Sequence, residues 1–202
     1  MIHSNDRRGR PCLPTTNWVA LFRGINVGGN HILPMKELTP LLEKLGCAQV
    51  VTYIQSGNAL FQHTNPDPTT LTQKIEVGIF EKYGFSPRLL LMKQSEFEKI
   101  VTQNPFSDAQ LISKTLHLFF LFKKPTTPNF EELNRLKSAS EAFSLIDTVF
   151  YLHAPDGIGR SALVAKIEKL LGVNVTARNW NTASALHALI KAPPAKPLLQ
   201  YL

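Results

Sequence analysis

Short apolar runs and helically spaced apolar residues alternate along the chain in a regular order. Residues 18–23, WVALFR, form an apolar run with the length and composition of a strand. Leu38, Leu41, Leu42 and Leu45 then recur at the spacing of one helical face, and a glycine at 46 is a suitable terminator. VVTYIQ (50–55) and NALFQH (58–63) predict two strands joined by a tight hairpin turn. A helix that ends at a glycine, and then a strand over 88–92, complete the first half of the pattern.

The same order of elements returns in the second half of the chain. The first half reads β-α-β-β-α-β, which is the split pattern of a ferredoxin-like fold. A helix over 94–103 follows, and the later pattern predicts a strand at 116–122, a helix at 125–137, strands at 144–147 and 149–154, a helix at 161–172, a strand at 173–178 and a helix at 180–190. We therefore expect an α+β protein with two ferredoxin-like (βαββαβ) subdomains, the second with an extra C-terminal helix.

These elements suggest boundaries along the 202 residues. We expect a flexible leader over 1–16, a first subdomain over 17–93, and a linking helix and loop over 94–112. The second subdomain is expected over 113–192 and a tail over 193–202. Domains of about 100–150 residues are commonest, so this length suits two small domains or one large one.

Composition and charge narrow the class of protein. No apolar run reaches the ~20 residues that span a membrane, and the polar, basic leader lacks the apolar region of a signal peptide. We therefore expect no membrane partner and a cytoplasmic location. The two cysteines, Cys12 and Cys47, form no CxxC motif and give no reason to expect a disulfide. The net charge of +7 is spread out without a long basic run, so it favours anions in general and supports nucleic-acid binding only weakly.

The stretch RGINVGGNHILP (23–34), between the first strand and the first helix, is one candidate for chemistry. Its glycines match neither the P-loop nor the dinucleotide fingerprint. Glycines can still turn backbone N–H groups toward an anion at a helix start, where cationic side chains add charge. The candidate ligand-binding residues here are Arg23, Gly24, Asn26, Gly28, Gly29 and Lys36. The alternative is a loop whose glycines and asparagines only turn the chain.

The hairpin YIQSGN (53–58) is a second candidate, with Tyr53, Gln55 and Asn58 as possible ligand-binding residues. Ser56 has no evident base nearby and lies outside a hydrolase elbow, so the catalytic residues stay unknown. A plain hairpin turn is the alternative. From strands of six residues at about 3.3 Å each, we expect the 24–33 loop and the 56–57 turn to lie at opposite ends of the sheet, about 20 Å apart.

The second half offers two further candidates. PDGIGRS (155–161) leads into a helix, and Gly157, Arg160 and Ser161 could hold a phosphate or carboxylate there. In the alternative interpretation the serine only caps that helix. TARNWNT (176–182) places Arg178 and Asn179 where a strand meets a helix, and an arginine beside a buried tryptophan needs a partner.

Other chemistries have no support in the sequence. The six histidines show no metal-ligand spacing, and the carboxylates lie mostly on predicted helix surfaces, so we expect neither a metal nor a cofactor. An RRM-type RNA surface needs aromatic residues on the first and third strands, and the third strand here offers only Phe61.

Four motifs together resemble one family. WVALFRGINVGGNHILPMKEL, TYIQSGNALF, YLHAPDGIGRSAL and TARNWNT resemble, in this order, a bacterial family known as domain of unknown function 1697. The resemblance runs from about Trp18 to about Ile190. It implies a two-part α+β protein with ferredoxin-like subdomains, and it implies that the candidate residues belong to the family signature. It implies no reaction.

These observations lead to one expected function and two alternatives. We expect a protein that binds a small anionic ligand, such as a nucleotide or a phosphorylated metabolite, between its two halves. The first alternative is an enzyme of unknown reaction that uses the same cleft. The second is a nucleic-acid-binding protein. The sequence leaves the oligomeric state open.

Overall fold

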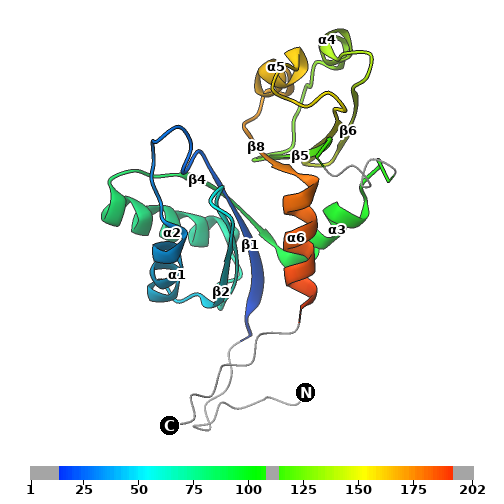
Figure 1. Ribbon diagram of the computed structural model, residues 1–202. Coiled ribbons are helices and arrows are strands. Elements are labelled where there is room, and N and C mark those ends of the chain that lie inside the picture. Colours follow the sequence, from blue (N-terminus) through cyan, green and yellow to red (C-terminus); the bar gives the residue numbers. More distant parts are fainter. Residues whose placement is uncertain (1–13, 108–113, 193–202) are drawn as a thin grey trace. The chain divides into compact units, whose positions relative to one another are not determined.

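The computed structural model describes residues 14–107 and 114–192, which form two compact units. Unit 1 comprises the described residues up to Gln94, and unit 2 comprises those from Ser95 onward. Each unit contains one four-stranded sheet with helices packed on it (Figure 1). Among the described residues, none of the helices has the length and apolar character needed to cross a membrane.

Unit 1 has the element order β-α-β-β-α-β. Its elements are β1 (Thr16–Arg23), α1 (Met35–Lys44), β2 (Ala48–Tyr53), β3 (Asn58–His63), α2 (Pro68–Tyr83) and β4 (Arg88–Lys93). The strands lie in the order β2-β3-β1-β4, and all neighbouring strands are antiparallel. This is the ferredoxin-like arrangement that the sequence predicted.

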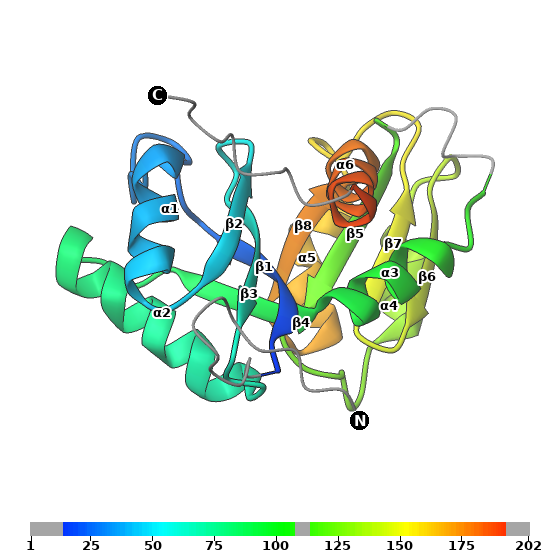
Figure 2. The same cartoon turned by 90° about the horizontal axis from the view of Figure 1, so that it is seen from below.

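Side-chain alternation along β1 shows which face of this sheet the helices α1 and α2 cover. Trp18, Ala20 and Phe22 belong to one core cluster with the buried leucines of α1 and the buried isoleucines of α2. Both helices therefore cover the same face of the sheet (Figure 2). The odd-numbered residues of β1, including Arg23, point to the opposite face, because successive side chains alternate across a strand.

Unit 2 repeats this order and adds a helix at each end. Its elements are α3 (Gln94–Thr102), β5 (Leu116–Leu121), α4 (Phe130–Leu136), β6 (Ala142–Ile146), β7 (Val149–His153), α5 (Ala162–Leu171), β8 (Val175–Asn179) and α6 (Trp180–Lys191). The strand order β6-β7-β5-β8 is the same as in unit 1. The chain is thus an α+β protein with two ferredoxin-like subdomains, and the expected C-terminal helix is α6.

Helices lie on both faces of the sheet in unit 2. Phe119 and Phe150 share a core cluster with apolar residues of α4 and α5. On the other face the ring of Phe97 in α3 stacks on Phe120 with centroids 6.0 Å apart, and the Tyr151 hydroxyl donates to the Ile100 carbonyl at 2.8 Å. Figure 1 shows α6 beside α3. The helix at 94–102 therefore packs as part of unit 2.

Most predicted elements differ from the structure by a residue or more at their ends, and two of these differences have a clear physical cause. The helix expected over 125–137 begins only at Phe130, because the Asn129 side chain caps it by accepting from the N–H of Glu132 at 2.9 Å. The strand expected over 50–55 is Ala48–Tyr53, since the chain leaves the strand at Ile54 with a φ of +48°.

Some of the expected segment boundaries fall on described residues and can be compared with the structure. The break between the strands predicted at 144–147 and 149–154 is a turn at Asp147, which has a φ of +50°. Thr16, assigned to the leader, is the first residue of β1. Residues 1–13 of the leader, 108–112 of the link and 193–202 of the tail lie outside the described residues.

Tyr151 offers a test of how α3 is held in unit 2. Burial raises the pKa of Tyr151 to about 12, whereas a tyrosine in an unfolded chain titrates near pH ~10. The folded state therefore holds this proton more tightly than the unfolded state does. The stability that comes from the neutral hydroxyl is complete below pH ~10, and it is lost as the pH rises from ~10 to ~12.

We expect Tyr151→Phe to lower the free energy of unfolding at neutral pH by about 1 kcal/mol, because the hydrogen bond to Ile100 is lost. The variant should also lose less stability than the wild type above pH ~10. Urea unfolding of both proteins at neutral and at alkaline pH measures the two effects. Identical losses above pH ~10 would contradict the assigned titration.

Candidate functional site

One end of unit 1 brings together the 24–34 loop and the β2–β3 turn. We call it the loop end and define it as residues 23–37, 53–58 and 81–88. Strands β1 and β2 both pair antiparallel with β3 and therefore run parallel to each other, so their C-terminal ends meet at this end (Figures 1 and 2). The N–H of Phe22 donates to the Gly57 carbonyl at 2.9 Å. The expected separation of about 20 Å between loop and turn is therefore wrong.

Asn26 ties the loop to itself and to the turn. Its side-chain oxygen accepts from the N–H of Leu33 at 2.8 Å, and its Nδ2 donates to the Leu33 carbonyl at 2.9 Å. The same Nδ2 donates to the Gln55 carbonyl, also at 2.9 Å. The side-chain amide of Asn26 is thus hydrogen-bonded within the protein, and these bonds hold the loop in place.

Gly28 and Gly29 form the outermost turn of the loop. Their φ angles are +60° and +78°, and the N–H of Asn30 donates to the Val27 carbonyl at 3.2 Å. Positive φ at both central residues defines a type I′ turn, which favours glycine. A Cβ at either position would meet no atom within 4 Å. These glycines are therefore needed for the backbone angle, and nothing approaches them closely.

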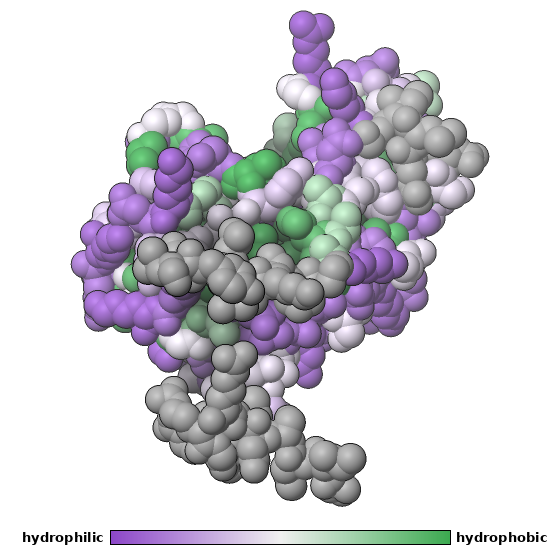
Figure 3. Space-filling view, turned by 60° about the horizontal axis from the view of Figure 1, so that its bottom comes forward, coloured by the Kyte–Doolittle hydropathy of each residue, from purple (hydrophilic) through white to green (hydrophobic). Residues whose placement is uncertain are grey.

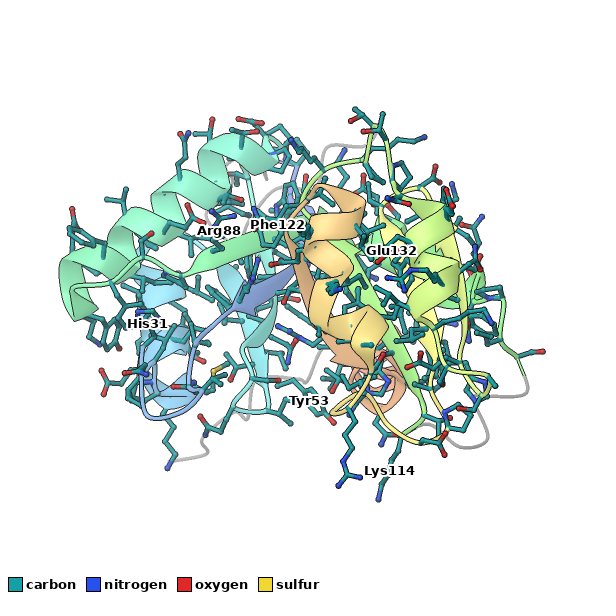
Figure 4. All side chains as sticks on the ribbon, turned by 90° about the horizontal axis from the view of Figure 1, so that it is seen from above. His31, Tyr53, Arg88, Lys114, Phe122 and Glu132 are labelled. Carbon is teal, nitrogen blue, oxygen red and sulfur yellow. The ribbon has the colours of Figure 1, made fainter. Side chains whose placement is uncertain are left out.

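His31 fastens the outer part of the loop to the chain that follows α2. Its ring stacks on Phe85 with centroids 4.8 Å apart. Its Nδ1 donates to the Gly24 carbonyl at 3.1 Å. Figure 4 labels His31 next to the end of α2. The loop is held in this way at both its base and its side.

The hairpin turn packs closely against β1. Asn58 is fully buried, and its Nδ2 donates to the Tyr53 carbonyl at 3.0 Å and to Ser56 Oγ at 3.4 Å. Gly57 has a φ of +80°, and a Cβ there would lie 2.5 Å from Ile25 Cδ1. Both residues stabilise the turn. Tyr53 is half-buried at the end of β2 (Figure 4), and Gln55 is exposed.

Arg23 and Arg88 lie directly opposite each other on β1 and β4. Both point to the face of the sheet away from α1 and α2, because Phe22 and Leu89 beside them belong to the helix-covered core. Arg23 is half-buried and Arg88, labelled in Figure 4, is exposed. With the residues that the structure describes, Arg88 makes no ion pair or hydrogen bond.

Arg88 is absent from the sequence-based candidates. Opposite residues of an antiparallel pair have Cβ atoms about 4.5–5.5 Å apart, so the two arginine side chains start from neighbouring positions on one face of the sheet. The predicted fold contained the information needed to find Arg88, because its first and fourth strands are neighbours. Pairing the last residue of one with the first residue of the other places the two arginines together.

The candidates of unit 2 are mainly residues that end or begin its elements. Ser161 caps α5 by accepting from the N–H of Val164 at 3.2 Å, and Asn179 caps α6 by accepting from the N–H of Thr182 at 3.0 Å. Gly157 has a φ of +81° in the turn before α5. Arg160 is exposed and makes no hydrogen bond or ion pair with the described part of the chain.

Arg178 is a buried cation on β8. Its Nη1 donates to Thr176 Oγ1 at 3.0 Å and to the Ala177 carbonyl at 2.8 Å. Burial lowers the pKa of Arg178 to about 10. The expectation that this arginine needs polar partners is met by these oxygens.

Comparison with known proteins decides the family. The profile described as protein of unknown function (DUF1697) matches residues 15–151, more than half of the chain. The chain belongs to the DUF1697 family. The motifs at 155–161 and 176–182 lie beyond the matched residues.

A solved structure has the same fold as this DUF1697 protein. It is the conserved bacterial protein SP0830 from Streptococcus pneumoniae, with a TM-score of 0.63 and 21% sequence identity. The match covers 88% of this chain and 100% of that chain. At this identity the likeness shows the fold alone. A search of curated proteins found no match.

The ionisable groups with the largest pKa shifts in the DUF1697 protein lie in its cores. Burial raises the pKa of the free Cys47 thiol to about 11, which keeps it protonated and unreactive at neutral pH. The shifts at Tyr151 and Arg178 also come from burial first. Among the described residues, no group of three or more His, Cys, Asp or Glu side chains could hold a metal ion.

Substitution of Asn26 tests its fastening role. We expect Asn26→Ala to lower the free energy of unfolding by about 2–4 kcal/mol, because three hydrogen bonds are lost and alanine is strained at a φ of +55°. Asn26→Gly is the matched control, since it loses the same bonds without the strain and should be less destabilised by about 1 kcal/mol. Urea unfolding measures both, and a wild-type midpoint for Asn26→Ala would refute the role.

Substitutions of Gly57 and Gly28 give a second matched comparison. Both have positive φ, but only at Gly57 would a Cβ collide, at 2.5 Å from Ile25 Cδ1 and 2.8 Å from Phe22 Cβ. We expect Gly57→Ala to cost about 2–4 kcal/mol of stability and Gly28→Ala about 1 kcal/mol. Thermal and urea unfolding of the two variants compare them directly. Equal costs would show that the close packing of the turn is unimportant.

Proposed function

We propose that unit 1 of this DUF1697 protein binds a small ligand through a phosphate or carboxylate group held between Arg23 and Arg88. The observation that carries the proposal is the register of β1 and β4, which places the two arginines directly opposite each other on the sheet face away from α1 and α2. Like charges in this position destabilise a sheet. An anion bound between them would lie between two cations.

The chemistry of arginine fits an oxyanion at this position. A guanidinium group presents a planar set of N–H donors that matches the two oxygens of a carboxylate or phosphate. The half-burial of Arg23 strengthens such a contact, because less water screens it. Gly24 follows directly, and a Cβ there would meet no atom within 4 Å, so the backbone beside Arg23 is open to a ligand.

Two other candidates lie at the loop end. Lys36 is exposed in the first turn of α1, where the helix dipole favours an anion, but α1 packs on the sheet face opposite to the two arginines. Tyr53 pairs with Asn58, which pairs with Leu21 of β1, so Tyr53 projects from the same sheet face as the arginines. Its hydroxyl is the group we assign to orienting the uncharged part of a ligand. That the ligand lies between the two halves stays a prediction.

The alternatives have less support. An enzyme needs activated groups, but the largest pKa shifts belong to buried groups that burial makes less reactive. An RNA-binding sheet of the RRM type displays aromatic side chains on its open face. In unit 1, Trp18, Phe22 and Phe61 all belong to the helix-covered core.

Neutralising the arginines tests the proposal in two ways. Without ligand, we expect Arg88→Gln to raise the free energy of unfolding by up to about 1 kcal/mol, because it removes repulsion between opposite residues. With ligand, Arg23→Gln and Arg88→Gln should each weaken binding by about tenfold or more, since charge-assisted hydrogen bonds are lost.

The measurement is ligand-induced thermal shift followed by calorimetry. The panel contains inorganic phosphate, nucleotides, sugar phosphates and dicarboxylates. Arg160→Gln is the matched control, because Arg160 is an exposed arginine of unit 2. A compound that binds wild type and both arginine variants of unit 1 equally well would place the site elsewhere, and loss only in Arg160→Gln would move it to α5. Absence of any shift across the panel would refute anion binding.

A further inference from the structure

Exposed aliphatic side chains gather at the loop end. Val27 is 67% exposed, Ile32 55% and Ile54 47%. The first two lie in the 24–34 loop and the third in the β2–β3 turn, and the hydrogen bond from Asn26 to the Gln55 carbonyl joins these two segments. We call Val27, Ile32 and Ile54 the aliphatic tip. Figure 3 shows apolar surface at this end of unit 1, at the upper left of the view.

The conformation of Ile54 is a second, independent observation. Its φ of +48° lies in the left-handed region, which β-branched residues rarely adopt. Asparagine or glycine would fit this turn with less strain. A strained and exposed isoleucine at position 54 therefore does not stabilise the fold. Strain of this kind is typical of positions whose side chain has a task outside the core.

Charges around the aliphatic tip are mainly positive. The loop end carries the cations Arg23, Lys36, Lys82 and Arg88 and the carboxylates Glu37 and Glu81. Glu37 is already paired with Lys82 at 2.8 Å and accepts from the Tyr83 hydroxyl at 2.9 Å. The surface around the tip is thus complementary to an anionic partner.

We propose that the aliphatic tip inserts into the interface of an anionic lipid bilayer, with the surrounding cations at the level of the headgroups. The aliphatic tip lies on the loop and the turn at one end of the sheet, so its side chains project outward and can enter the bilayer interface. Peripheral binding of this kind depends on buried apolar area and on attraction to anionic lipids, and the loop end provides both.

This proposal replaces the expectation of no membrane partner. That expectation depended on continuous apolar runs, which spanning segments need. Val27 and Ile54 are separated in the sequence and come to the same end of unit 1 only in the fold, so no run reveals them. The proposal shares the cations Arg23 and Arg88 with the arginine site, but it assigns insertion to the aliphatic side chains, so variants of the tip test it separately.

Cosedimentation of the full chain with vesicles tests it. The probes are vesicles of phosphatidylcholine alone and of phosphatidylcholine mixed with phosphatidylglycerol, at low and high salt. We expect binding to the mixed vesicles that weakens with salt. Ile54→Asn should lower the partition coefficient by about tenfold, and Val27→Asn/Ile32→Asn by more. Val77→Asn is the matched control, since Val77 of α2 is equally exposed at 55% and lies outside the loop end.

Ile54→Asn also separates lost binding from lost folding. Asparagine suits the left-handed conformation, so the variant should unfold at the same or a higher urea concentration than wild type. Wild-type chain that stays in the supernatant with mixed vesicles would overturn the proposal. So would binding that all tip variants retain, because attraction would then be electrostatic only. Concentration-dependent dimerisation abolished by the tip variants, without vesicle binding, would assign the tip to a second copy of the chain. The anion panel applied to Ile54→Asn shows independently whether the arginine site is intact.

Discussion

The side-chain amide of Asn26 makes the contacts on which the loop end depends. A single group closes its own loop at Leu33 and attaches that loop to the neighbouring turn at Gln55. Its backbone has a positive φ, which asparagine tolerates better than most residues. Few residue types combine this backbone angle with one acceptor and two donor hydrogens on a short side chain. This one amide group therefore joins the 24–34 loop to the β2–β3 turn.

Polar residues at the loop end divide into an inner and an outer set. In the inner set, the side-chain amides of Asn26 and Asn58 form hydrogen bonds within the protein. The glycines at 28 and 57 allow the positive backbone φ, and the glycine at 57 also allows close packing. Arg23 and Arg88 lie at the end of β1 and the start of β4, on the sheet face opposite to α1 and α2. Sequence motifs do not distinguish these sets, because both consist of residue types that also bind ligands.

Much of the fold could be predicted from apolar periodicity and turn residues. The strand runs at 18–23 and 58–63 and the helical leucines from Leu38 onward identify the ferredoxin-like order, which both sheets confirm. The predicted separation of loop and turn failed for a topological reason. A helical crossover leaves the first and second strands parallel, so the loop after one and the turn after the other share an end. Local pattern alone does not contain this information.

Other misses have local physical causes. Prolines at 125 and 128 and the cap at Asn129 delay the start of the helix until Phe130, although the composition of the segment favours a helix. Arg88 was missed because an isolated arginine at a strand start carries no motif. It gains meaning only through its partner across the register, which requires pairing two strands that are distant in the sequence.

The turn at Gly28 and Gly29 has a consequence for how such a protein can change. The loop is closed below this turn by Asn26, and open space surrounds both glycines. The turn itself therefore adds little packing to the folded state. Its exposed side chains can change without a change in the fold of unit 1 beneath them, because Asn26 closes the loop below the turn.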